Sequence, residues 1–225
     1  MGAEHDSVDD RAPDRPAAIE EPAVLSPRAE RKCAQLLDGA RAVILARGFE
    51  GASVDDIARE AGISKATLYR YYPDKSALFA AVMARDCGRQ SEAMDGLCVE
   101  GRPLEAVLAD IGARYITFGL SAQAQSVFRT AVAESERFPD IGRAFYESGI
   151  DNARATLAPL IAAGMDRGEL VAEDADLAAH RFFGLCKAEM FFKRLFGVVE
   201  SYRCDEIAAR ASDAARVFMR MYRPD

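Results

Sequence analysis

The stretch ASVDDIAREAGISKATLYRYYPDK, residues 52–75, decides the fold of this chain of 225 residues. Ser53 precedes a short helical pattern, and its hydroxyl can accept a hydrogen bond from a free N–H of the first turn, while the Asp56 carboxylate reaches back as the acidic member of a capping box. Gly62 supplies the positive φ that a sharp turn between two helices needs. Ser64 then caps a second helix. This order predicts two short helices joined by a tight turn.

The apolar residues of this stretch fall where two crossing helices would touch. The small side chain of Ala58 allows a close approach, and Leu68 on the second helix points back at the first. Because each position answers a steric demand of the crossing, the spacing is typical of a helix-turn-helix. We therefore predict such a motif from Ser53 to Lys75, with its second helix in the major groove of DNA. The predicted contact residues are Ile57, Ala58, Ile63 and Leu68.

The opposite face of the second helix carries the candidate DNA contacts. Lys65 can donate to guanine or to phosphate, and Thr67 can bond a base edge or a phosphate. The alternative for Tyr69 is packing inside the protein, and packing is the expected role of Tyr72. Ser53 and Lys75 are expected at phosphates. The predicted set is Ser53, Ser64, Lys65, Ala66, Thr67, Tyr69, Tyr71 and Lys75.

The distribution of charge agrees with this assignment although the net charge is −7. Residues 1–27 carry two basic and seven acidic side chains, and residues 81–225 carry eighteen and twenty-two. Residues 28–80 carry nine basic and seven acidic ones, so the positive segment is the one with the helix-turn-helix. Since the local field acts on a phosphate backbone, the net acidity does not exclude DNA binding.

The rest of the chain indicates an all-α protein. Residues 1–27 contain four prolines and an acidic excess, which predicts a disordered arm. From residue 28 onward the apolar positions recur with helical period and without strand alternation. We expect an N-terminal three-helix DNA-binding domain at 28–80 and a further helical bundle at 81–225. About nine helices are predicted, at 28–47, 54–60, 64–71, 74–95, 103–119, 122–136, 140–167, 174–198 and 205–222.

Several other classes of protein are disfavoured. No apolar run reaches the ~18–20 residues of a membrane span, and the acidic start differs from a signal peptide, so we expect a cytoplasmic protein. The five cysteines are scattered, which predicts reduced thiols and neither a metal site nor a cofactor. Phosphate-binding loops and catalytic triads are missing from the sequence. Glu134 and Glu136 diverge on a helix and make a poor acid–base pair. An enzyme is therefore not expected.

Residues 52–75 resemble the DNA-binding module of TetR-family repressors, and the resemblance extends over about 28–80, with Phe49 as a core aromatic residue. It implies a homodimer on a palindromic double-stranded DNA operator, and it assigns residues 81–225 to a helical-bundle ligand-binding and dimerisation domain that takes an inducer. Residues 134–149, ESERFPDIGRAFYESG, resemble the AefR-like or AcrR-like branch. The residues that the resemblance assigns to the operator are Thr67, Leu68, Tyr69, Tyr71 and Lys75.

Four aromatic residues are candidates for the ligand site. They lie on the three helices that would enclose a ligand in this fold, and ordinary core packing is the alternative for each. Polar residues are few and dispersed within 103–167, so we expect an apolar or amphipathic small molecule. The candidates are Phe118, Phe128, Phe145 and Tyr146.

Residues 177–199, most of which lie on the helix expected at 174–198, carry two apolar faces, whereas a helix on the surface of a monomer needs one. One face includes Leu177 and Phe196, and the other includes Phe183. We expect a partner subunit to cover the second face together with the last helix; burial by another helix of the same chain is the alternative. The predicted interface residues are Phe183, Cys186, Met190, Ala211, Ala215 and Phe218.

Together these patterns predict a dimeric repressor that a small apolar or amphipathic ligand releases from its operator. The alternative is a DNA-binding regulator without an inducer, acting as an activator or an architectural factor. Against that alternative stand the ~145 residues that follow the helix-turn-helix, which exceed what dimerisation alone requires.

Overall fold

The computed structural model describes residues 26–95, 101–172 and 174–224, with no side chains described for 89–95. The described residues form helices and their connections, without a strand, which confirms the predicted all-α class. Most of the predicted disordered arm at 1–27 lies outside them. The helices are α1 (Pro27–Gly51), α2 (Val54–Glu60), α3 (Lys65–Tyr71), α4 (Lys75–Asp95), α5 (Leu104–Leu120), α6 (Ala122–Glu134), α7 (Pro139–Phe145), the π-helical turn η1 (Tyr146–Asp151), α8 (Asn152–Asp166), α9 (Ala175–Leu195) and α10 (Cys204–Met221).

The helix expected at 140–167 exists as one continuous run with a change of winding. Helix α7 passes directly into η1 and then into α8, so that a wider π-helical segment separates two α-helical ones. A π-helical turn has i to i+5 hydrogen bonds, so it alters which residues share a face of the helix. No helix in the described ranges is both long enough and apolar enough to cross a membrane.

The local signals around the helix-turn-helix act largely as expected. The Ser53 hydroxyl accepts a hydrogen bond from the Asp56 N–H at 3.1 Å, and the Ser64 hydroxyl accepts one from the Thr67 N–H at the same distance. The Asp56 carboxylate accepts a 2.7 Å hydrogen bond from the Ser53 hydroxyl. Gly62 has φ +63° at the turn between the two helices, a value that side chains resist.

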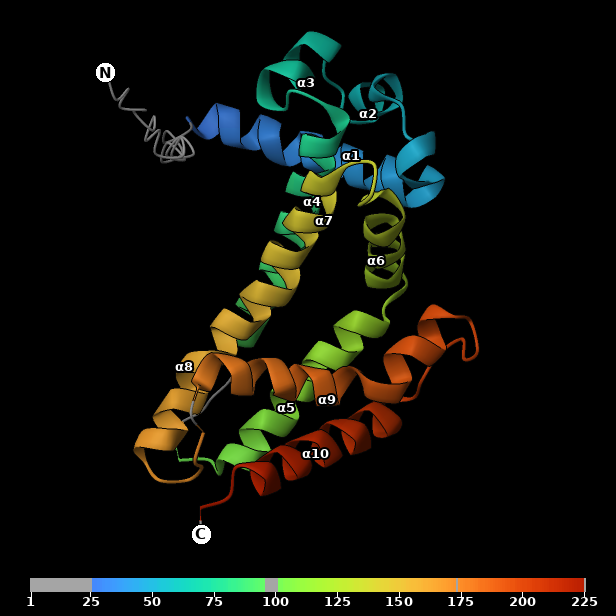
Figure 1. The fold of residues 1–225 in the computed structure, drawn as a ribbon. Helices are drawn as coiled ribbons and strands as arrows, with labels where there is room; N and C mark the ends of the chain where they lie inside the picture. The colour runs from blue at the N-terminus through green and yellow to red at the C-terminus, as the bar shows by residue number, and fades with distance from the viewer. Residues whose placement is uncertain (1–25, 96–100, 173, 225) are drawn as a thin grey trace, which may run out of the picture.

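The molecule has two hydrophobic cores at opposite ends (Figure 1). One core joins α1–α4 with Ala131 of α6 and Ile141 of α7. The other joins α5, α8, α9 and α10. Helices α4 and α7 run side by side between the two ends (Figure 1). The helix-turn-helix is therefore connected to the C-terminal bundle by packed helices as well as by the chain itself.

A close contact between α1 and the end of α2 fixes the helix-turn-helix against its own domain. Gly39 faces Ala61, and a Cβ atom built on Gly39 would lie 2.7 Å from the Ala61 backbone nitrogen and 2.8 Å from its Cα. Both atoms belong to the main chain and cannot rotate away. The absence of a side chain at this position is thus a condition for the crossing.

We predict that Gly39→Ala lowers the free energy of unfolding of the N-terminal core by roughly 1–3 kcal/mol, because the added methyl group overpacks a backbone contact. Gly88→Ala in α4 is the matched control, since a Cβ there meets no atom within 4 Å. Its expected effect is a gain of up to ~1 kcal/mol from helix propensity. The measurement is urea unfolding followed by far-ultraviolet circular dichroism, and equal stability of the Gly39→Ala variant and the parent would contradict the contact.

Candidate DNA-binding surface and ligand cavity

Helix α3 presents one buried and one exposed face. Leu68 is fully buried against the N-terminal core, while Ile63 packs on that core at the turn. Lys65 and Ala66 are exposed, and the Tyr69 side chain is 49% exposed. The exposure of Tyr69 argues against the packing alternative. These three residues form an outward face at the end of the molecule opposite α10 (Figure 1).

The caps of α2 and α3 orient the first turns of both helices. Besides accepting the Thr67 N–H, the Ser64 hydroxyl lies 2.8 Å from the Thr67 hydroxyl. Ser53 and Ser64 are exposed, and Thr67 is half-buried. The hydroxyl groups thus hold the helix starts in place and remain near the surface from which a phosphate would approach.

Ion pairs neutralise the acidic residues beside this surface. Lys65 pairs with Asp55 at 2.8 Å, and this hydrogen bond raises the pKa of the lysine. Asp56 accepts from the Ser53 hydroxyl, which lowers the pKa of its carboxyl group, and it also pairs with Arg59 and, at 2.7 Å, with Arg47. The carboxylates of Asp55 and Asp56 are therefore compensated in the absence of DNA.

The structure corrects the expected role of Lys75. Its ammonium donates a 2.7 Å hydrogen bond to the carbonyl oxygen of Phe49 and lies 4.3 Å from the centroid of the Phe49 ring. The side chain thus stabilises the end of α1 instead of being presented to a phosphate. Tyr71 is half-buried against the N-terminal core, with the Arg70 guanidinium 5.3 Å from its ring. Tyr72 packs on the same core, as expected, with its hydroxyl 3.2 Å from the Cys33 sulfur.

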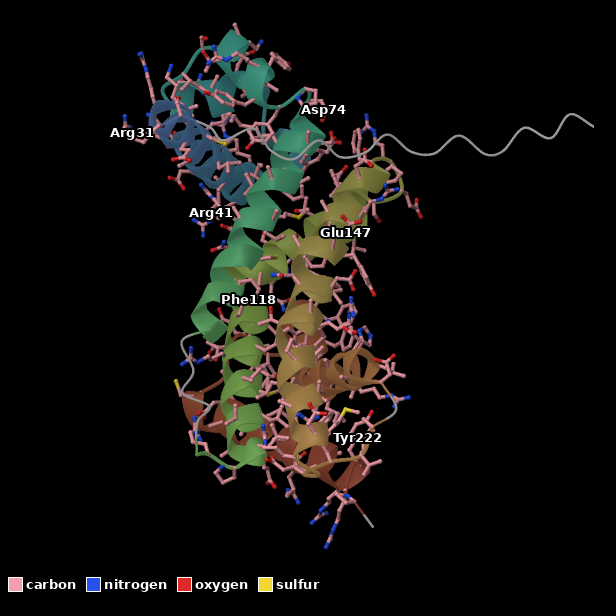
Figure 2. The ribbon with its side chains drawn as sticks, turned by 90° about the vertical axis from the view of Figure 1, so that its left-hand side faces the viewer. Arg31, Arg41, Asp74, Phe118, Glu147 and Tyr222 are labelled. Atoms are coloured by element: carbon pink, nitrogen blue, oxygen red, sulfur yellow. The ribbon has the colours of Figure 1, made fainter. Side chains whose placement is uncertain are left out.

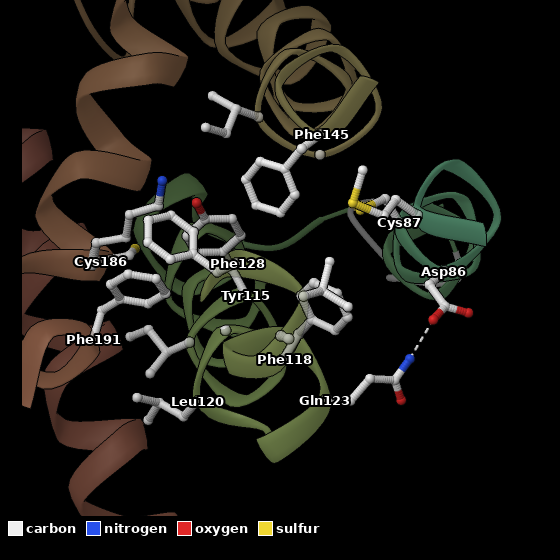
Figure 3. A pocket seen from close by; sticks show the side chains of 18 residues that line it. Asp86, Cys87, Tyr115, Phe118, Leu120, Gln123, Phe128, Phe145, Cys186 and Phe191 are labelled. Carbon is white, nitrogen blue, oxygen red and sulfur yellow. Dashed lines mark hydrogen bonds between the residues drawn. The ribbon is translucent and has the colours of Figure 1, made fainter. Parts of the chain in front are cut away.

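A cavity of about 100 Å³ lies among α4, α5, α6, the α7–η1 segment and α9 (Figure 3). Phe118, Phe128 and Phe145, three of the four predicted ligand residues, line it. Figure 2 shows Phe118 midway between Arg41, on the N-terminal side, and Tyr222 at the other end.

The prediction that Tyr146, the fourth residue, lines the ligand cavity is wrong. Its side chain is 47% exposed and is not part of the cavity wall. Phe145 faces the cavity, whereas the next side chain along the helix, Tyr146, points toward solvent.

The cavity lies between the two hydrophobic cores and shares wall residues with each. Met83, Val127 and Phe145 line the cavity and also belong to, or pack against, the core of the N-terminal domain. Ile116 and Cys186 line it from the C-terminal core. The cavity wall thus includes side chains of the core that carries the helix-turn-helix as well as side chains of the C-terminal core.

A polar cluster, which the sequence reasoning missed, closes the α4 side of the cavity. Asp86 is 9% exposed and accepts a 2.9 Å hydrogen bond from the Arg41 Nε of α1. Gln123 of α6 donates to the same carboxylate oxygen and accepts from Arg41 (Figure 3 shows the bond to Asp86). The cluster joins α1, α4 and α6. No sequence motif announces it, because its members are separated by 37 to 82 positions.

The prediction that six residues of the last two helices contact a partner subunit is also wrong. Phe183, Cys186 and Met190 of α9 are buried in the core of the single chain, as are the three predicted residues of α10, so none is available to a partner. The alternative, burial within the monomer, is the observed one. The α10 residues are Ala211, Ala215 and Phe218.

The other apolar face of α9 is the exposed one. Phe192 is 52% exposed and Phe196 is 76% exposed. The face predicted to meet a partner is thus the one buried in the monomer, and the face predicted to meet the core is exposed at Phe192 and Phe196 but lines the cavity at Phe191. The backbone of α9 is non-helical at Ala188, with φ 10° and ψ −118°.

Two family profiles match the chain. The profile described as bacterial regulatory proteins of the tetR family matches residues 36–82, and the profile described as the C-terminal domain of AefR-like transcriptional repressors matches residues 106–224. The second match covers more than half of the chain, and the first coincides with the helix-turn-helix.

Among curated proteins, the transcriptional activator FasR of Mycolicibacterium smegmatis is 44% identical over 59 residues, which are 26% of each chain. The match thus spans about a quarter of that relative. The transcriptional regulator YezE of Bacillus subtilis is 29% identical over 135 residues, 59% of this chain and 69% of that protein.

Solved structures extend the likeness to nearly the whole fold. A TetR-family transcriptional regulator from Mesorhizobium loti MAFF303099 is 26% identical with a TM-score of 0.79, over 88% of this chain and 99% of that one. The flavonoid-responsive regulator FrrA is 28% identical with a TM-score of 0.71, over 87% and 99%. The chain belongs to the TetR family of DNA-binding transcriptional regulators, and its C-terminal domain is of the AefR-like type.

Proposed function

We propose that this regulator is a dimeric repressor that binds a palindromic operator and leaves it when a small amphipathic ligand enters the cavity among α4, α5, α6 and α9. The observation that carries the proposal is the position of this cavity between the two cores. Its wall includes Met83, Val127 and Phe145, which also support the helix-turn-helix. A ligand that displaces these side chains changes the packing beneath the DNA-binding surface.

The size of the cavity favours such a coupling. About 100 Å³ is less than the ~300–1,000 Å³ of a ligand pocket that holds a drug-sized molecule. A ligand larger than a single ring must therefore push the half-buried rings of the wall outward. Because interiors are closely packed, this displacement is passed on to α4 and α6. The cluster of Arg41, Asp86 and Gln123 gives the movement a direct polar connection to α1.

The DNA contacts in this proposal come from the exposed face of α3 and the caps of both short helices. Lys65, Ala66, Tyr69 and the half-buried Thr67 face the groove, and the Ser53 and Ser64 N-termini face phosphates. So short a surface makes few base contacts, and a single copy binds weakly. Two copies on a palindrome supply the missing affinity.

The dimer contact is assigned to the exposed apolar face of α9, with Phe192 and Phe196 at its centre. Large exposed aromatic side chains next to each other are a common feature of subunit interfaces. In this arrangement the α9–α10 end of each subunit holds the two DNA-binding ends at a fixed separation, so that the operator spacing depends on the dimer geometry.

A second candidate function is a transcriptional activator without an inducer. The observation that favours it is the FasR match, since FasR is described as an activator and its similarity covers the DNA-binding part. In vitro transcription from a promoter that carries the selected operator distinguishes the two. A repressor lowers the amount of transcript, and an activator raises it.

We expect Lys65→Ala to weaken binding to an operator selected from random DNA by about 1–3 kcal/mol if the lysine contacts a base, since a charged donor to a base edge is lost. Asp55→Asn should leave binding unchanged or strengthen it by up to ~1 kcal/mol, because it frees Lys65 and removes a negative charge. Fluorescence anisotropy at several salt concentrations measures both, with Arg220→Ala as the control, because Arg220 is an exposed residue of α10 at the end of the molecule opposite α3. Equal affinity of Lys65→Ala and the parent would refute the assignment of α3.

We expect the double variant Phe192→Glu/Phe196→Glu to sediment as a monomer at micromolar concentration, because two carboxylates would be buried at each copy of the contact. Operator affinity should fall with it, since one DNA-binding end acts alone. Val132→Glu on α6, where the side chain is 59% exposed, is the control and should remain a dimer. A double variant that still sediments as a dimer would show that the contact lies elsewhere.

A further inference from the structure

The α9 side of the cavity holds a cation without a described counter-ion. Lys187 lines the cavity, and its Nζ lies 5.8 Å from the centroid of the Tyr115 ring. Within the described part of the chain, no carboxylate pairs with it. Lys193, six residues further along α9, is exposed and paired with Glu189. The carboxylate at the other side of the cavity, Asp86, is already paired with Arg41.

Lys187 is half-buried, and its partial burial disfavours the charged form of the unpaired ammonium. This burial lowers the pKa of Lys187, and no described charge acts in the opposite direction. Buried charges in proteins are as a rule paired or hydrogen-bonded. An anion at this place would supply what the single chain lacks.

Tyr115 offers a second donor at the same place. Its burial raises the pKa of the hydroxyl well above the ordinary value, so the group remains protonated. Its hydroxyl makes no hydrogen bond to any other described residue. Figure 3 shows Tyr115 on the side of Cys186 and Phe191, away from Asp86 and Gln123. The two donors therefore belong to one end of the cavity, and the paired acid belongs to the other.

The remaining wall suits an aromatic body. The Phe128 ring meets Phe145 edge to face at 5.7 Å and meets Phe191 edge to face at 5.1 Å. Edge-to-face contacts of this kind are the preferred surroundings of another aromatic ring. A dry cavity of about 150 Å³ is known to admit one benzene ring, so the present one of about 100 Å³ needs only a small displacement of its wall to do so.

We propose that the cavity binds small aromatic carboxylic acids, with the carboxylate accepting hydrogen bonds from Lys187 Nζ and the Tyr115 hydroxyl and the ring held among Phe118, Phe128 and Phe145. This proposal rests on the ligand-responsive function above and names the chemical class of the ligand. Neutral and cationic compounds of the same shape leave the ammonium unpaired and bind less well. The acidic group of the ligand is oriented toward α9, and its apolar end points toward α4 and α6.

The test is calorimetric titration of the full-length protein, without DNA, with two pairs of probes: benzoate and benzamide, and 2-naphthoate and 2-naphthamide. At least one acid should bind roughly 10- to 100-fold more tightly than its amide, as expected for charge-assisted hydrogen bonds. Lys187→Met should remove this preference, because it weakens the binding of the acid and leaves the binding of the amide unchanged. Lys193→Met, a lysine of the same helix outside the cavity, should retain it. Lys187→Gln serves as the second variant, and far-ultraviolet circular dichroism verifies that each variant is folded.

The proposal is wrong if acid and amide bind equally, if neither binds, or if Lys187→Met keeps the preference for the acid. These outcomes are separable from failure of the proposed function, because operator binding is measured independently on the same unliganded proteins. An amide that binds as well as the acid and releases the operator would support the ligand-responsive repressor and refute only the preference for an anionic ligand. A parent protein that binds no operator would refute the proposed repressor function, whatever the result of the titrations.

Discussion

The packing of α4 on α1 is the interaction on which the rest of the structure depends. Leu78, Phe79, Val82 and Met83 of α4 are buried in the core that carries the helix-turn-helix. One turn later, the same helix supplies Asp86 and Cys87 to the cavity. Arg85 of α4 also donates to the Ala34 carbonyl oxygen at 3.1 Å and pairs with Asp38 of α1 at 2.9 Å. Because α4 is attached to α1 at these points, a displacement of the part of α4 that lines the cavity also displaces the DNA-binding end.

The polar groups at the cavity fall into two sets, one with hydrogen-bond partners in the protein and one without. Asp86, Arg41 and Gln123 satisfy one another, so they serve the connection between helices. Lys187 and Tyr115 have no such partners among the described residues, although burial shifts the pKa of both. Two donors without a protein partner beside an apolar cavity are the arrangement expected where an acidic ligand binds.

The helix-turn-helix could be predicted in detail because its determinants are local. Ser53, Gly62, Ser64 and Leu68 lie within sixteen consecutive residues, and capping, turn conformation and the buried face follow from their spacing alone. The two-faced character of α9 was recognisable for the same reason. The three phenylalanines of the cavity could also be predicted, because large apolar side chains on adjacent helices are buried in the space between those helices.

What the sequence by itself determined is thus the all-α class, the DNA-binding motif and the aromatic lining of the cavity. Only the tertiary structure decided which face of α9 is covered, that Lys75 belongs to the end of α1, and that Tyr146 points away from the cavity. It alone brought Arg41, Asp86 and Gln123 together and left Lys187 beside Tyr115. The physical reason is that periodicity shows that a face is apolar but not what covers it. A charged side chain finds its partner by proximity in space, which spacing along the chain does not encode.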